Sequence, residues 1–285
     1  MIQGIHSADE YLYHYTTAGT ARAYILKDAT IRLGSYTTTN DPKETKQWEF
    51  GLGTNSNRDL AKYNHSELSR WLSDELKRRT RLACFATDTG PLTGDHMSDL
   101  LRRGFAKPRM WAQYAANHTG VCLVFLKSNL LAVAKQELES HYWMTGSVQY
   151  RNHDVVRGID AHEYMLNVDI YDALGPEAYA SAHAKQFHGA LYFEKLEDWR
   201  DECEWRILAL ANSPAEIFLP IRQCLAGVMH GDATDPDLSE ELMRLTHGWN
   251  GVEHMGLSWK NSAPWYDYGS FGWSPGKVTK PRRRA

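Results

Sequence analysis

The amino-acid sequence predicts an α+β fold in a single domain, and two observations support this expectation. Short runs typical of strands are separated by helical patterns, without the regular alternation that a doubly wound parallel sheet requires. No repeat of fixed period is visible, and no strong linker divides the chain. We therefore expect one domain over residues 1–262, with peripheral helices around a sheet. An aromatic and then basic tail over 263–285 is expected to be partly disordered.

The first predicted strand covers residues 11–15. Period-two alternation places Leu12, His14 and Thr16 on one face and three tyrosines on the other. Thr17 is placed to cap a following helix. The next expected elements are a strand at 30–33, a turn at Asn40-Asp41-Pro42 that opens a helix, a helix through 68–76, a strand at 82–86, a loop over 87–107, a short helix at 110–115 and a strand at 121–126.

The clearest late strand is predicted at residues 204–211. Glu202, Glu204 and Arg206 are spaced by two at its start, so period two predicts that they share one face, with Cys203 and Trp205 opposite. The other elements expected after residue 126 are a helix capped by Ser128, a strand at 147–150, a long helix over roughly 176–199, a strand at 225–229, a helix around 242–245 and a strand at 252–257.

The composition is that of an ordinary globular protein, with 42% hydrophobic residues, 24% charged residues and a formal net charge of −3. No basic-then-apolar leader and no long apolar run is visible, so we expect a cytoplasmic protein without a membrane partner. The four cysteines form no CxxC pair and lie away from histidine pairs at zinc spacing, which predicts reduced thiols and no metal site.

Basic residues gather in three places: 77–81, 102–109 and 280–284. They are typical of solvated faces and a flexible tail, or of a local footprint for an anionic macromolecule.

Several catalytic motifs are missing from the chain. The sequence contains no GxGxxG after a strand, no GxxxxGK[ST], no HExxH and no GxSxG. A Rossmann site, a phosphate loop, a zinc peptidase and a serine hydrolase are therefore disfavoured.

Two groups of residues could carry chemistry. His14, with the neighbouring hydroxyl of Thr16, could hydrogen-bond a ribose diol, because imidazole offers one donor and one acceptor. On the late strand, Arg206 could hold one carboxylate of the Glu202–Glu204 pair ionised while the other meets a substrate. For each group a structural role, as a satisfied strand histidine or a surface ladder of charge, stays open.

Five segments together resemble a widespread bacterial domain family of unknown function, in order and in spacing, over roughly residues 10–232. They are LYHYT at Leu12–Thr16, NDPKE at Asn40–Glu44, CFAT at Cys84–Thr87, MWAQYAANHTGVCLVF at Met110–Phe125 and KLEDWRDECEWR at Lys195–Arg206. That family in turn distantly resembles the ADP-ribosyltransferase superfamily. This resemblance implies a split, mixed β-sheet core of the ADP-ribosyltransferase type, with peripheral helices.

The resemblance also implies an activity, namely NAD-dependent ADP-ribosyl transfer to a macromolecular target, nucleic acid or protein. A toxin or phage-defence effector, with a neutralising antitoxin as partner, fits this activity. Glu204 would be the catalytic carboxylate, and Glu202 would orient the target. The residues that would bind NAD are His14, Tyr15, Thr16, Tyr36, Asn40, Asp41, Tyr114, His118 and Arg206, with Tyr36 and Tyr114 both candidates for packing on nicotinamide.

Two other classes of function are kept as alternatives. One is a metal-dependent nucleic-acid-processing enzyme, such as a nuclease that uses His14, Asp41 and Glu204. The other is a non-catalytic binding module that retains the pocket. Binding of NAD would separate the first reading from both, because a ligand that binds the folded state raises its stability.

Overall fold

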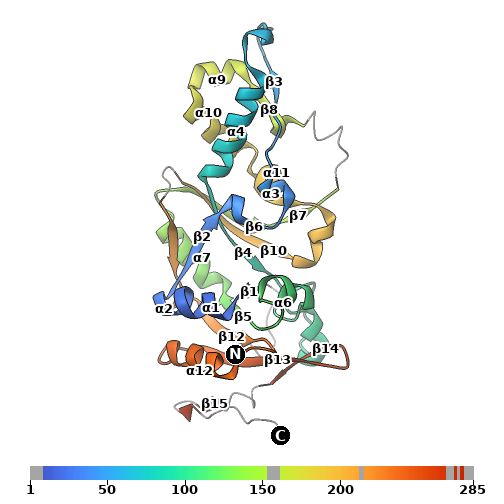
Figure 1. The fold of residues 1–285 in the computed structure, drawn as a ribbon, viewed down its shortest axis with the longest axis vertical. Helices are drawn as coiled ribbons and strands as arrows, with labels where there is room; N and C mark the ends of the chain where they lie inside the picture. The colour runs from blue at the N-terminus through green and yellow to red at the C-terminus, as the bar shows by residue number, and fades with distance from the viewer. Residues whose placement is uncertain (1–8, 153–160, 212–214, 268–272, 275–276, 279–285) are drawn as a thin grey trace.

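The computed structural model describes residues 9–152, 161–211, 215–267, 273–274 and 277–278 (Figure 1). Its strands are β1 (Tyr11–Thr16), β2 (Thr30–Ser35), β3 (Gly51–Gly53), β4 (Thr80–Ala86), β5 (Val121–Leu126), β6 (Tyr142–Ser147), β7 (Gln149–Tyr150), β8 (Met165–Asn167), β9 (Glu194–Lys195), β10 (Glu204–Leu210), β11 (Ile217–Pro220), β12 (Leu225–His230), β13 (Glu253–Lys260), β14 (Ala263–Asp267), β15 (Trp273–Ser274) and β16 (Lys277–Val278).

The α-helices are α1 (Ala18–Thr20), α2 (Leu26–Asp28), α3 (Pro42–Thr45), α4 (His65–Arg79), α5 (His96–Asp99), α6 (Pro108–Tyr114), α7 (Lys127–Glu137), α9 (Val168–Leu174), α10 (Pro176–Gln186), α11 (His188–Tyr192) and α12 (Pro236–Leu245). A π-helical turn, η1 (Ala21–Ile25), joins α1 to α2, and 3-10 turns lie at η2 (Tyr36–Thr38), η3 (Leu60–Lys62), η4 (Leu100–Arg102), η5 (His162–Tyr164) and η6 (Glu197–Glu202).

The largest sheet is mixed and, in the described part of the chain, contains ten strands. Its main path runs β11-β2-β4-β1-β5-β12-β13-β14, and β10 adds to β4 and carries β6 on its far edge. The β12–β13 pair is parallel, whereas its other paired strands are antiparallel. The structure is therefore mixed α/β, and it agrees with the expectation of a mixed sheet with peripheral helices.

The sheet forks at β4. One edge of β4 pairs with β10 along its whole length, from Thr80 to Ala86. The other edge is shared, because Arg81 and Leu82 pair with β2, whereas Ala86 pairs with Tyr13 of β1. The middle of this edge thus faces a gap between β2 and β1.

Three apolar clusters cover the sheet. On one face Leu12, Phe85 and Ile207 pack with α7, α12 and the η1 region. On the opposite face there are two clusters. One surrounds Trp111 of α6 and the tyrosines of β1, and the other surrounds Trp48 beneath α4, α10 and α11. Figure 1 shows α4 and α10 with β3 and β8 at the upper end, α11 closer to the sheet, α6 beside β1, and α12 toward the lower end. The predicted division of β1, with Leu12 on one face and the tyrosines on the other, is confirmed.

Most predicted elements are present, and their capping follows the sequence. Thr17 accepts a hydrogen bond from the Thr20 amide, and Asp41 caps α3 with Pro42 at its first turn. The cap predicted at Ser128 is wrong by two residues, since the N-cap of α7 is Leu126. The loop expected over 87–107 contains the short α5 and η4.

The long helix predicted over 176–199 is wrong. The chain there breaks after Gln186 into α11, then β9, then η6. The chain leaves the helical conformation at Phe187, between α10 and α11, and Tyr192 at the end of α11 packs into the aromatic cluster around Trp48. The break matters for the site, since it places Lys195 on β9 rather than on a helix.

The predicted tail begins within the sheet. Residues 263–267 form β14, which pairs with β13. The rest of that tail, apart from the short β15 and β16, lies outside the described residues, as does its basic end at 280–284. Within the described residues, no helix combines the length and the apolar character needed to cross a membrane.

The backbone packs so closely on Gly231 that there is no room for a side chain without a shift. A Cβ at this position would lie 2.1 Å from the carbonyl oxygen of His118 and 2.8 Å from its carbonyl carbon. We expect Gly231→Ala to lower the free energy of unfolding by about 1–3 kcal/mol, because backbone must shift to admit the methyl group. Urea denaturation measures this, with Gly189→Ala as control, since a Cβ there meets nothing within 4 Å. Equal stability of the two variants would contradict the close packing of the α6–β5 loop on β12.

Candidate functional site

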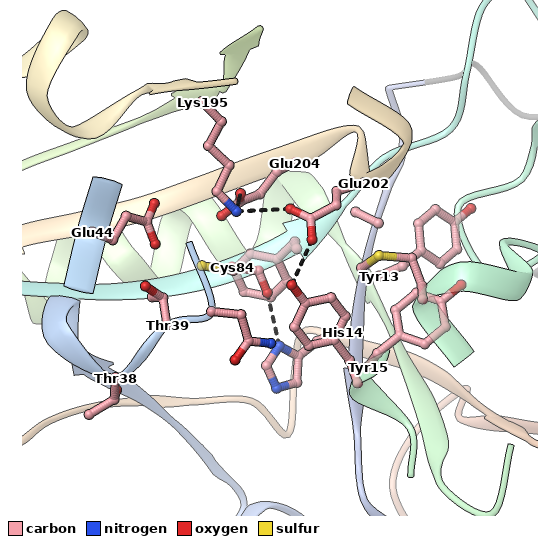
Figure 2. A pocket seen from close by; sticks show the side chains of 15 residues that line it. Tyr13, His14, Tyr15, Thr38, Thr39, Glu44, Cys84, Lys195, Glu202 and Glu204 are labelled. Carbon is pink, nitrogen blue, oxygen red and sulfur yellow. Dashed lines mark hydrogen bonds and ion pairs between the residues drawn. The ribbon is translucent and has the colours of Figure 1, made fainter. Parts of the chain in front are cut away.

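A pocket of about 240 Å³ opens at the fork of the sheet. Its walls come from five parts of the chain that are distant in sequence: β1 at 13–15, the turn after β2 at 38–40 with Glu44 of α3, β4 at 84–86, α6 with Met110 and Tyr114, and the β9–β10 region with Lys195, Glu202 and Glu204. Figure 2 shows His14 across the pocket from Glu204 and Lys195. His14 and Glu204, each singled out in the sequence, therefore line the same pocket.

His14 of β1 lies beside the middle of β4, between the residues of β4 that pair with β2 and the residue that pairs with β1. Its Nδ1 lies 2.9 Å from the carbonyl oxygen of Cys84 (Figure 2). A carbonyl can only accept, so Nδ1 carries the proton and donates. Burial lowers the pKa of His14 and so favours the neutral ring, although the bond to Cys84 opposes this. The neutral imidazole then keeps its Nε2 lone pair as an acceptor for a hydroxyl group.

Glu204 is held ionised by two cations. Its Oε1 accepts from Arg206 Nε at 2.7 Å, and its Oε2 lies 2.8 Å from Lys195 Nζ. Burial by itself would raise the pKa of this carboxyl group, but the charges of Arg206 and Lys195 outweigh burial and lower the pKa to about 2. Glu204 is 5% exposed, so its charge acts in a largely water-free setting.

Lys195 joins the two carboxylates of the ExE segment. Its Nζ contacts Glu202 Oε2 and Glu204 Oε2, each at 2.8 Å (Figure 2). Burial would lower the pKa of this ammonium group, but the neighbouring carboxylates, Glu204 foremost, raise it. The hydroxyl of Tyr114 donates to Glu202 Oε1 at 2.6 Å, and burial with the nearby Glu202 charge raises the pKa of Tyr114. Tyr114 is therefore a neutral donor that fixes Glu202.

Arg206 is a structural cation behind the pocket. It is fully buried and contacts Glu204, Glu44 and the carbonyl oxygen of Tyr192. It does not line the cavity. The prediction that Arg206 holds a carboxylate ionised agrees with these contacts, whereas direct contact between Arg206 and a bound cofactor does not.

Local backbone geometry brings Glu202 and Glu204 together. The strand begins only at Glu204, because Cys203 adopts a left-handed conformation with φ of 46° and Glu202 ends the 3-10 turn η6. The period-two argument for Glu202 is therefore wrong, although Lys195 still gathers both carboxylates. Thr87 holds the kink, since its amide and its hydroxyl both donate to the carbonyl oxygen of Cys203 at 2.9 Å.

The other predicted NAD-binding residues divide into two groups. Tyr15, Asn40 and Tyr114 line the pocket together with His14. The remaining ones do not line it: Thr16 lies at the end of β1, Tyr36 is buried with its hydroxyl donating to Leu191, Asp41 caps α3, and His118 stacks on Trp111 near Trp259. Of the two tyrosine candidates, Tyr36 and Tyr114, Tyr114 alone lines the pocket.

Lys195 and Glu44 were not singled out from the sequence, yet both line the pocket. Each belongs to a segment that carried the resemblance, NDPKE for Glu44 and KLEDW for Lys195. A signal was thus present, but a lone Lys or Glu in a polar stretch is most often solvated. Here they are 5% and 0% exposed, respectively.

The basic clusters are less free than their sequence suggests. Lys77 and Arg103 are buried, the first over the ring of Trp48 and the second paired with Asp88 at 2.8 Å. Arg109 is exposed, and its guanidinium stacks on Trp199. Lys77 and Arg103 therefore cannot contribute to a basic surface over 77–81 and 102–109.

A second cavity of about 590 Å³ adjoins the pocket, since Lys195 lines both. Its lining includes Lys43, Arg151 and the rings of Trp48, Phe50 and Tyr164. Across the described part of the chain, no three His, Cys, Asp or Glu side chains are grouped so that they could hold a metal ion.

Comparison with known proteins gives one match. No curated protein and no solved structure matches the chain significantly. Residues 110–207, which run from α6 to the middle of β10 and include the ExE segment, are similar to a family described as a protein of unknown function, DUF2971.

Proposed function

We propose that this protein is an NAD-dependent ADP-ribosyltransferase that acts on a macromolecular target. One observation carries the proposal: a neutral histidine and two buried carboxylates, distant in sequence, face each other across one pocket. The pocket volume of about 240 Å³ lies just below the ~300–1,000 Å³ of typical small-molecule pockets, so it suits a nucleoside-sized part of NAD. The adjoining cavity offers space for the remainder.

The roles of the side chains follow from their contacts. His14 Nε2 accepts a hydrogen bond from a ribose hydroxyl, while Nδ1 stays fixed on Cys84. The C–N bond to nicotinamide breaks with its electron pair moving to the ring nitrogen, which leaves positive charge on the ribosyl carbon. The ionised Glu204 stabilises this oxocarbenium-like state, as carboxylates do in glycoside cleavage. The acceptor then bonds to this carbon and releases a proton, for which Glu202 is the nearby base.

Binding of NAD is the first test of this proposal. We expect NAD to raise the unfolding temperature, since ligand at 100 times its Kd stabilises the folded state by about 2.7 kcal/mol. His14→Asn retains a side-chain donor for Cys84 but lacks the ring acceptor. It should weaken NAD binding about tenfold, the cost of one hydrogen bond. Thermal shift and calorimetry measure both effects. Unchanged NAD affinity in a folded His14→Asn variant would remove His14 from the site.

Lysate treated with the protein and isotope-labelled NAD would then identify the acceptor by mass spectrometry. Label on arginine or another side chain indicates a protein target, and label on a base or a phosphate end indicates nucleic acid. The toxin or phage-defence role, and the antitoxin it would require, belong to the same proposal and rest on a labelled target being found.

One observation favours a second candidate, a non-catalytic binding module. Both carboxylate oxygens of Glu204 are already engaged, by Arg206 and Lys195. In that case NAD does not raise the unfolding temperature, and no label from NAD enters any target. The nuclease alternative has less support, because Asp41, which it requires, caps α3 and does not line the pocket.

A further inference from the structure

The floor of the pocket holds more carboxylates than cations. Glu44, Glu202 and Glu204 are each at most 5% exposed. The cations in contact with them are Lys195 and Arg206, also buried. Three negative charges therefore meet two positive charges in a setting where water screens little.

Glu44 holds the unbalanced part of this charge. One of its oxygens, Oε1, contacts Arg206. The other, Oε2, is enclosed by protein and has no hydrogen-bond partner in the described part of the chain, although Glu44 lines the pocket. In Figure 2 the carboxylate of Glu44 lies on the same side of the pocket as Lys195 and Glu204.

Glu44 has further charged neighbours. The buried ammonium of Lys77 acts on Glu44 across space, but Asp74 shares its charge, and its hydrogen bond goes to the carbonyl oxygen of Lys46. Lys43 forms its own ion pair with Glu194 at 3.5 Å; Arg151 lies 3.8 Å from the same carboxylate but is 61% exposed, so water screens its charge. Asp41 is 1% exposed and adds a further carboxylate, whose Oδ2 also lacks a partner within the described residues. Among these buried groups, four carboxylates (Asp41, Glu44, Glu202 and Glu204) therefore meet three cations (Lys77, Lys195 and Arg206), which leaves one negative charge in excess.

A buried charge without a counter-charge is costly, so a ligand that brings one positive charge into this pocket gains what the protein lacks. We propose that Glu44 determines specificity by making the pocket select a ligand moiety with a single positive charge over its neutral counterpart. If the proposed function holds, the positively charged moiety is the oxidised nicotinamide riboside, whose ring carries one positive charge; this identification rests on the proposed function. The reduced form has nearly the same shape and is neutral.

The charge in the pocket changes as the proposed reaction proceeds. Before cleavage, the positive ring offsets the excess carboxylate. When the C–N bond breaks, the ring nitrogen takes the electron pair, and nicotinamide leaves as a neutral molecule. The positive charge passes to the ribosyl carbon and is finally carried away as the proton lost by the acceptor. Glu44 thus favours the charged donor and does not retain the neutral product.

Calorimetry at low ionic strength and pH 7 tests the assignment with nicotinamide riboside and its dihydro form as probes. The wild-type protein should bind the oxidised riboside about tenfold or more tightly than the reduced one, as expected for one charge pair in a poorly screened site. Glu44→Gln should weaken binding of the oxidised form and leave that of the reduced form unchanged. Glu137→Gln, which neutralises an exposed carboxylate on α7, should behave like the wild type.

The outcomes separate Glu44 from the proposed function. If both ribosides bind equally in the wild type and in Glu44→Gln, the assignment of Glu44 is overturned and the function stands. If no riboside binds, but the ribose-free cation 1-methylnicotinamide binds the wild type and not Glu44→Gln, the function fails and the assignment stands. Should Glu44→Gln not fold, the wild-type ratio decides alone, and equal or tighter binding of the reduced form overturns the assignment.

Discussion

Replacement of Glu204 by Gln is expected to lower the rate of ADP-ribosyl transfer by a factor of ~10²–10³, the usual cost of removing one preorganised electrostatic group. Gln retains the shape of the side chain but loses the charge that faces the developing cation. Single-turnover kinetics with labelled NAD measures this loss. Glu137→Gln serves as the control, because its carboxylate is exposed on α7 and does not line the pocket. Near-full activity in a folded Glu204→Gln variant would exclude Glu204 as the catalytic carboxylate.

The same substitution should alter stability at acid pH. The folded-state pKa of Glu204 is lowered to about 2, below its value of about 4.3 in an unfolded chain. Its ionised form therefore stabilises the fold fully above the unfolded pKa, and this contribution is lost as pH falls through about 2. Glu204→Gln should lose part of the pH dependence between about pH 5 and 2. At pH 7 its destabilisation should stay under the ~3–5 kcal/mol typical of a broken buried pair, because Glu44 and Glu202 still accompany Arg206 and Lys195.

Replacement of Arg206 by Met is expected to be the most destabilising change among those considered. Met fills a similar volume but leaves Glu44 and Glu204, both buried, without their shared cation. Loss of one partner from a buried ion pair typically costs about 3–5 kcal/mol. Urea denaturation at pH 7 gives the value. Arg32→Met is the control, since Arg32 is 57% exposed in its pair with Glu216, and such pairs contribute ~0–1 kcal/mol.

A double variant makes this prediction sharper. Adding Glu204→Gln to Arg206→Met removes one of the carboxylates left without a cation. The double variant should therefore lose less free energy of unfolding than the two single variants lose together. Strict additivity, or a loss for Arg206→Met no larger than that for Arg32→Met, would show that Arg206 is not the cation that balances this site.

The sequence indicated the local elements well and the connections between them poorly. Alternation sufficed for β1, because Leu12 and the tyrosines enter different apolar clusters. It failed after Gln186, where the apolar spacing continues but the chain turns to bury Tyr192. The fork at β4 could not be seen in the sequence at all, since it depends on which strands share one edge.

Part of the candidate site could likewise be predicted from local sequence patterns. His14, Glu202 and Glu204 lie in short segments with distinctive spacing, so the sequence could name them. Lys195 and Glu44 become unusual only once they are buried beside one another, and burial is a tertiary property. For Arg206 the expected contact with a carboxylate is present, but its assignment to the cofactor could not be judged, because spacing alone does not tell whether a cation faces a cavity or lies behind it.

The fork at β4 also bears on how the chain folds. β4 must wait for β10, which follows more than a hundred residues later, before its second edge is paired. Pairings of such long sequence separation form slowly, since the intervening chain must be ordered first. The pocket requires residues from Tyr13 to Glu204, so it cannot exist on the ribosome until β10 has emerged. A nascent or truncated chain that ends before β10 would therefore lack the pocket.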